Sequence, residues 1–182
     1  LAQEVIAGEE EIDDFELEID EACTMLIARR QPAASDLRMV MSVSKMIRDL
    51  ERIGDEAKKI AKMAIVLSEE GSAPHGYVEI RHIAKGVRSM LKDALDAFAR
   101  FDVDAAIATL KADEQVDLDY KTALRELITY MMEDPRSISR VMNILWTLRS
   151  LERVGDHTKN ICEHIVYLVR GEDIRHSNLA DL

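Results

Sequence analysis

The sequence is poor in aromatic residues, glycine and proline. Phe, Tyr and Trp together make up 4% of the 182 residues, and the chain contains only seven glycines and three prolines. Ala, Leu, Ile, Met, Glu, Lys and Arg dominate instead, and no stretch is rich in strand-forming residues. This composition favours an all-α protein.

Further absences restrict location and partners. The two cysteines, Cys23 and Cys162, lie far apart in helical patterns, so we expect thiols of a reducing compartment and neither a disulfide nor a zinc site. No apolar run reaches the ~18 to 20 residues of a membrane span, and no basic-then-apolar signal segment opens the chain. The formal charge of −11 argues against nucleic acid as a partner. We therefore expect a soluble, cytoplasmic protein that reaches a membrane only through partner proteins.

Prolines and capping residues predict five helices. Pro32 ends the first helix, Ser35 caps the second, and Asp102 caps the fourth. Pro135 stands at a first-turn position of the fifth helix, which ends at Gly171. The predicted helices span roughly 1–31, 35–70, 78–100, 103–133 and 135–170.

A short sequence motif occurs twice, as RDLERIGD at 48–55 and as RSLERVGD at 149–156, which is 101 positions later. When residues 37–67 are laid on 138–168 without a gap, 11 of 31 positions are identical. An internal duplication of this length sets the architecture. The fourth and fifth helices correspond to the first and second, so the third should have a counterpart upstream of Leu1.

The duplication predicts two pseudo-symmetric three-helix bundles, with the first helix of the N-terminal bundle absent from this chain. The opening residues already follow a helical pattern without a cap, which agrees with a chain that begins inside a helix. We place an incomplete N-terminal bundle at 1–72 and a complete C-terminal bundle at 77–182, joined by a linker at 71–76 that contains Gly and Pro.

Each half of the chain carries two acidic pairs of the form acid-x-x-x-Asp, one on each of two helices. Side chains four residues apart share one helix face, so two such pairs on antiparallel helices would present four carboxylates to one volume. Hard cations with oxygen ligands suit that volume. The candidate metal ligands are Glu9 and Asp13 with Glu51 and Asp55 in the first half, and Asp113 and Asp117 with Glu152 and Asp156 in the second.

The alternative is a solvated acidic face. Like charges four residues apart cost ~0.2–0.5 kcal/mol per pair, and the unfavourable pair recurs four times. Lys59, which could pair with Asp55, is replaced by Asn160 in the second half, although the acids are kept. These two observations favour metal binding near the surface over a solvated face.

Glycines and arginines accompany the acids. Gly54 and Gly155 occupy equivalent positions inside helices, where glycine costs ~1 kcal/mol relative to alanine. They indicate a need for room, either for close helix approach or for space over a cluster. Nearby basic and amide side chains would offset the acidic charge, hold a carboxylate in place or face a partner. These residues are Arg48, Arg52, Arg149, Arg153 and Asn160.

Sequence signatures of common enzymes are missing. There is no G-x-x-x-x-G-K-[ST] loop, no G-x-G-x-x-G, no H-E-x-x-H and no nucleophile elbow. We therefore predict a non-catalytic protein with no catalytic residues. The alternative is a metal-dependent hydrolase or phosphatase that uses the acidic clusters, which would also need an open coordination position and a substrate pocket.

Four segments together resemble the PhoU family of bacterial phosphate-uptake regulators. They are Leu50–Asp55, Leu151–His157, Gln31–Arg38 and Tyr167–Asp173, and the resemblance covers nearly the whole chain. It implies two three-helix bundles related by pseudo-symmetry. It also implies surface metal clusters, of iron, zinc, manganese or magnesium, held by the eight acids named above.

The resemblance further implies a function and its partners. A protein of this family is expected to regulate phosphate uptake and to keep phosphate-starvation genes off when phosphate is plentiful. It would do so by coupling the ATP-binding subunit of the phosphate ABC transporter to a phosphate-sensing histidine kinase, and we expect it to act as a homodimer.

Overall fold

The structure, a computed structural model, describes residues 1–69 and 77–175. Within these two ranges the chain forms helices and no strand, which confirms the all-α prediction. The predicted linker at 71–76 lies outside the described residues. The elements are α1 (Ala2–Arg30), α2 (Ala34–Glu69), α3 (Tyr77–Arg100), α4 (Val103–Glu133), the short 3₁₀ helix η1 (Pro135–Ser137) and α5 (Ile138–Arg170).

Local signals set most helix ends. Asp102 caps α4 as predicted, because its Oδ1 accepts a hydrogen bond from the Ala105 amide at 3.0 Å. Gly171 ends α5 in the left-handed conformation, at φ 75°, which glycine adopts without strain. The predicted cap at Ser35 is wrong, since α2 already begins at Ala34.

The predicted start of the fifth helix is also wrong. Pro135 opens η1, and α5 begins only at Ile138. The Asp134 carboxylate accepts a hydrogen bond from the Arg136 amide at 3.2 Å, and the Ser137 amide donates a hydrogen bond to the Asp134 carbonyl at 3.0 Å. These bonds hold a tight 3₁₀ turn, which is a frequent way to start an α-helix.

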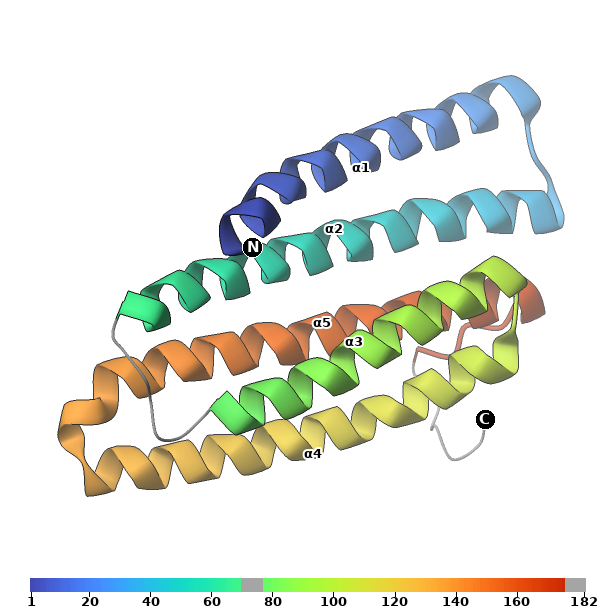
Figure 1. Ribbon diagram of the computed structural model, residues 1–182. Helices are drawn as coiled ribbons and strands as arrows, with labels where there is room; N and C mark the ends of the chain where they lie inside the picture. Colours follow the sequence, from blue (N-terminus) through green and yellow to red (C-terminus); the bar gives the residue numbers. More distant parts are fainter. Residues whose placement is uncertain (70–76, 176–182) are drawn as a thin grey trace.

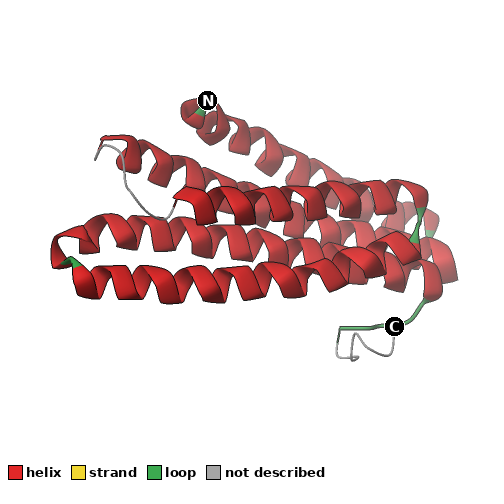
Figure 2. Ribbon diagram, turned by 60° about the horizontal axis from the view of Figure 1, so that its bottom comes forward, coloured by secondary structure: helices red, strands yellow, loops and turns green. Residues whose placement is uncertain are grey.

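The long helices lie side by side with roughly aligned axes (Figures 1 and 2). Helices α3, α4 and α5 pack against one another as a bundle. Helix α2 lies along α5, and this pair shares the most extensive contact between any two elements. Helix α1 lies on the far side of α2 (Figure 1). The division into bundles at 1–72 and 77–182 stays a prediction.

The apolar core lies in the α3–α5 bundle and includes one side of α2. Leu110, Leu148 and Ile165 are fully buried there, and α2 adds Met46 and Ile53. No hydrophobic side chain of α1 is buried, and Phe15 and Leu17 are 50% and 68% exposed. Helix α1 is therefore held to the rest of the molecule by α2 through half-buried apolar and polar contacts.

Two expectations from the composition bear on this fold. Cys162 is buried in the core and Cys23 is half-buried, and both are free thiols. None of the described helices combines the length and the apolar character that crossing a bilayer demands.

Candidate functional site

The first acidic site lies between α1 and α2. Burial raises the pKa of Glu51, and the negative charges of Asp55, Glu16 and Asp13 raise it further. This coupling means that the α1 and α2 acids lie close enough to repel one another. Glu16, one turn beyond Asp13 on α1, belongs to this group, although the sequence analysis did not select it.

The second acidic site lies between α4 and α5 and repeats this arrangement. Burial raises the pKa of Asp113 to about 6; Lys159 opposes the rise, while Asp117 and Asp156 add to it. The pKa of Glu152 is also raised, by burial first and then by Asp156. Within the described part of the chain, the buried Oε2 atom of Glu152 has no hydrogen-bond partner. The four predicted acids of the second half therefore act on one another electrostatically.

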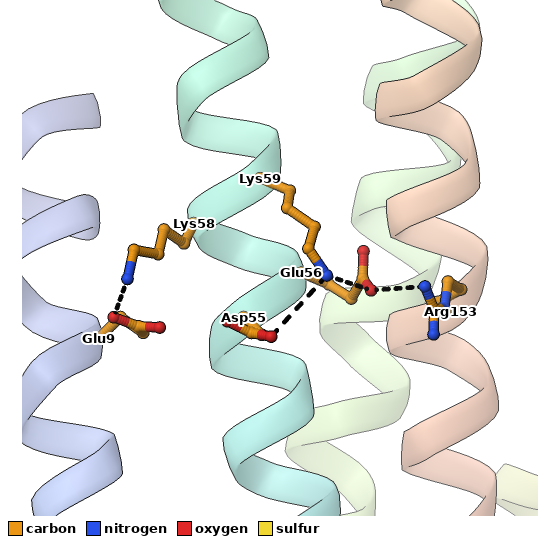
Figure 3. A network of polar contacts seen from close by, with 6 residues as sticks. All are labelled: Glu9, Asp55, Glu56, Lys58, Lys59 and Arg153. Atoms are coloured by element: carbon orange, nitrogen blue, oxygen red, sulfur yellow. Dashed lines mark hydrogen bonds and ion pairs between the residues drawn. The ribbon is translucent and has the colours of Figure 1, made fainter.

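A lysine lies against the innermost acid of each site. On the α1 side, Lys58 donates a hydrogen bond to Glu9, which is only 5% exposed (Figure 3). On the α4 side, Lys159 Nζ lies 3.7 Å from Oδ2 of Asp113, which is also 5% exposed. Lys58 and Lys159 occupy equivalent positions and are among the 11 identities of the duplication. The signal was present in the sequence, but the analysis of acidic pairs did not use it.

The two glycines at equivalent positions of the repeats each lie against the helix that faces them. A Cβ atom on Gly54 would lie 3.1 Å from Ile12 Cδ1, so this glycine permits close approach of α1 and α2. A Cβ atom on Gly155 would lie 3.2 Å from Asp113 Oδ1 and 3.7 Å from Val116 Cγ1. In the first half the need for room comes from helix packing, and in the second half from packing and from an acid of the cluster.

Arginines of the second repeat pair with glutamates. Arg149 Nη1 lies 2.8 Å from Glu152 Oε1, and Arg153 Nη1 lies 3.1 Å from Oε1 of the buried Glu56. Lys59 reaches the same Glu56 oxygen at 3.1 Å and Asp55 at 3.8 Å (Figure 3). The network in Figure 3 thus ties the rim of the first acidic site to α5.

Asn160 and two histidines converge on a buried carboxylate that the sequence analysis missed. Asp49 Oδ1 lies 2.9 Å from His157 Nδ1 and accepts a hydrogen bond from Asn160 Nδ2 at 3.0 Å, and His164 Nε2 lies 3.6 Å from Oδ2. Burial opposes ionisation of Asp49, but these contacts outweigh it and hold its pKa well below the usual range. The internal duplication did not point to Asp49, because the equivalent residue in the second repeat is Ser150.

The donor atoms at the two acidic sites suit a hard cation, because all are carboxylate oxygens. However, among the described residues no three Asp, Glu, His or Cys side chains are grouped so that they could hold a metal ion. Lysines contact the innermost acids, Glu9 and Asp113. A metal ion would therefore bind only after carboxylates rotate toward one another and the lysine moves away. The arrangement as it stands concentrates negative charge that a cation would relieve.

These features define a class of long-helix bundle proteins with duplicated acidic helix pairs. Residues 1–64 and 80–165 match the PhoU domain family. The chain is 62% identical over 179 residues to the phosphate-specific transport system accessory protein PhoU homolog of Pseudomonas putida, covering 98% of this chain and 70% of that protein. It is 47% identical over 176 residues to the accessory protein PhoU of Escherichia coli K12, covering 97% and 73%.

Solved structures agree with the sequence comparison. The crystal structure of PhoU from Pseudomonas aeruginosa superposes with a TM-score of 0.92 at 61% identity, covering 94% of this chain and 82% of that one. The phosphate transport system regulatory protein PhoU from Streptococcus pneumoniae superposes with a TM-score of 0.85 at 35% identity, covering 94% and 80%. The chain belongs to the PhoU family.

Proposed function

We propose that this protein is a non-catalytic accessory protein of a phosphate-specific transport system and a negative regulator of the phosphate-starvation response. The observation that carries the proposal is the 62% identity, over 98% of the chain, to a relative named as such an accessory protein. In this proposal it acts in the cytoplasm and couples the ATP-binding subunit of the transporter to the phosphate-sensing histidine kinase.

The surface of α1 supports a role in protein–protein association. Among the described residues, helix α1 packs extensively only on α2, and several of its apolar side chains remain exposed. Exposed apolar surface of this kind marks sites of interaction between proteins. Self-association as a homodimer and docking on the transporter or kinase are the interactions that we propose. The exposed apolar residues of α1 include Val5, Phe15, Leu17, Met25, Leu26 and Ile27.

We include metal binding at the two acidic sites in the proposal. Burial first, and then repulsion between the acids, raises the pKa values of Asp113 and Glu152, and a bound cation would favour their ionised forms. The unpartnered Glu152 Oε2 atom supports metal binding as well. Glu9, Asp13, Glu51 and Asp55 would hold one group of divalent or trivalent ions, and Asp113, Asp117, Glu152 and Asp156 the other. Iron, zinc, manganese and magnesium are the candidates.

A reporter strain tests the regulatory role. The gene for this protein is deleted in its own host, and a starvation-promoter reporter is measured in phosphate-rich medium. We expect the deletion to switch the reporter on and the returned gene to switch it off. A pull-down with the kinase and the transporter's ATP-binding subunit tests the partners. Unchanged repression in the deletion strain contradicts the proposed function.

Elemental analysis and a turnover assay separate the metal and enzyme hypotheses. The double variants E51A/D55A and E152A/D156A each remove one acidic site, so each is expected to lose about half of the metal bound per chain. The exposed Glu114→Ala variant is the control and should keep the full amount. An unchanged metal ratio in both double variants refutes the metal sites. Turnover of a phosphate ester by the metal-loaded protein would instead favour the hydrolase.

A further inference from the structure

A cavity of about 330 Å³ lies between α2, α5 and the residues that follow α5. None of the eight acids of the two acidic sites lines it. The cationic side chains in its lining are Lys45, Arg48 and Arg52 of α2 and Arg175, and His164 of α5 also lines it. The carboxylates in the lining are Asp49 and Glu163. The lining thus holds four permanent cations and two acids, and one of the cations, Arg175, is already paired with Asp173.

Of the two acids of the cavity, Asp49 is already engaged within the protein, whereas Glu163 forms no hydrogen bond or ion pair in the described ranges. Asp49 is bound by His157, Asn160 and His164. Burial raises the pKa of Glu163, against the opposing charges of Lys159, His164 and Arg175. Neither Arg48 nor Arg52 has a hydrogen bond or an ion pair to another residue in the described ranges. Both guanidinium groups are exposed and stand one turn apart on α2.

The internal duplication provides a comparison within the same molecule. Arg48 and Arg52 correspond to Arg149 and Arg153. The second pair is neutralised, by Glu152 at 2.8 Å and by Glu56 at 3.1 Å.

The difference between the two repeats has a traceable cause. The residue equivalent to Glu56 in the other repeat is His157, which binds Asp49 and offers Arg52 no carboxylate. This substitution accounts for Arg52, whereas Glu51, the equivalent of Glu152, is present but forms no ion pair with Arg48 in the described ranges. The first repeat thus presents the same arginine pair without an ion-paired carboxylate, beside a cavity that could receive an anion.

We propose that this cavity binds a phosphate-type oxyanion, with Arg48 and Arg52 as its main ligands. Guanidinium groups form paired, charge-assisted hydrogen bonds with tetrahedral oxyanions. The Lys45 ammonium, which lies 5.7 Å from the centre of the Tyr167 ring, adds a further positive charge to the lining. The nearby carboxylates favour a ligand that keeps a proton, since a hydrogen phosphate donates to a carboxylate and a sulfate cannot.

Calorimetric titration tests the site with three probes, inorganic phosphate, sulfate and ADP. The full chain is used both as purified and after dialysis against a chelator, so that anions bound through metal ions are recognised. The test variant is R48Q/R52Q. The control is R88Q/R100Q, which makes the same charge change at two exposed arginines of α3. Thermal melts check that both variants fold.

We expect saturable phosphate binding that is at least tenfold weaker in R48Q/R52Q, unchanged in the control and stronger than sulfate binding. Tighter binding of ADP than of phosphate would identify a nucleotide as the ligand of the cavity. Tighter binding of phosphate than of ADP would identify free phosphate as the ligand. Four results overturn the proposal: no saturable binding of any probe, binding by R48Q/R52Q equal to that of the unmodified protein, equal weakening in the control, or binding that disappears after chelation.

Discussion

Replacing Asp113 by asparagine should stabilise this protein at neutral pH. Asp113 is 5% exposed and faces α5 from α4, where burial raises the pKa of its carboxyl from an ordinary 3.8 to about 6. A group whose pKa is higher in the folded than in the unfolded chain costs stability once the pH is high enough to ionise it. Asparagine has nearly the same shape and carries no charge, so it avoids this cost.

The size of the effect follows from the two pKa values. Each pKa unit corresponds to 1.36 kcal/mol, so ionising Asp113 in the folded protein costs about 3 kcal/mol relative to the unfolded chain. The cost is nearly complete at pH 7.5. It falls below about 1 kcal/mol at pH 4, where the folded carboxyl is protonated and the unfolded one is only partly ionised. The free energy of unfolding of Asp113→Asn should therefore exceed that of the unmodified protein by about 3 kcal/mol at pH 7.5, and the gain should shrink as the pH falls through 6 toward 4.

The assay is urea denaturation at both pH values with a chelator present, because a bound cation would remove the same cost. Glu114→Gln removes an equal charge from the adjacent, exposed position of α4, and an exposed change of this kind should stay within about 0.5 kcal/mol. An Asp113→Asn variant that gains nothing at pH 7.5, or gains equally at pH 4, would show that burial does not destabilise this carboxylate.

Three further predictions concern contacts that hold the helices together. Gly155→Ala should lose the usual gain of up to ~1 kcal/mol from replacing a helical glycine, because its Cβ meets Asp113 at 3.2 Å, whereas Gly8→Ala, with nothing within 4 Å, should show that gain in thermal melts. Asp49→Asn should lower the free energy of unfolding by about 1–3 kcal/mol at pH 7, since it weakens charge-assisted hydrogen bonds. The loss should shrink as the pH falls below 3.8, because the depressed pKa of Asp49 contributes stability only above its unfolded value; a constant loss would contradict this. Lys58→Met should lower the free energy of unfolding by leaving the buried Glu9 carboxylate unpaired, and denaturation with an unchanged midpoint would refute that pairing.

The fold and the acidic pairs were predictable because they depend on local periodicity. The helix-favouring composition extends along the chain, and the Asp102 cap and the Gly171 terminus act within one or two turns, so the helices follow from neighbouring residues. The prediction of where α5 starts was wrong because Asp134 holds Pro135 in a 3₁₀ turn. Helix ends depend on single hydrogen bonds of this kind.

By itself, the sequence determined that the chain is helical, that it is internally duplicated, and that Glu51 and Asp55 share a face with a counterpart at Glu152 and Asp156. Only the tertiary structure decided which charges are satisfied. It paired Lys58 with Glu9, whereas Arg48 lacks an ion-pair partner in the described chain. The physical reason is that such pairings join residues tens to more than a hundred positions apart. They depend on how each helix is rotated and shifted against its neighbour, and packing of the whole core sets that rotation and shift.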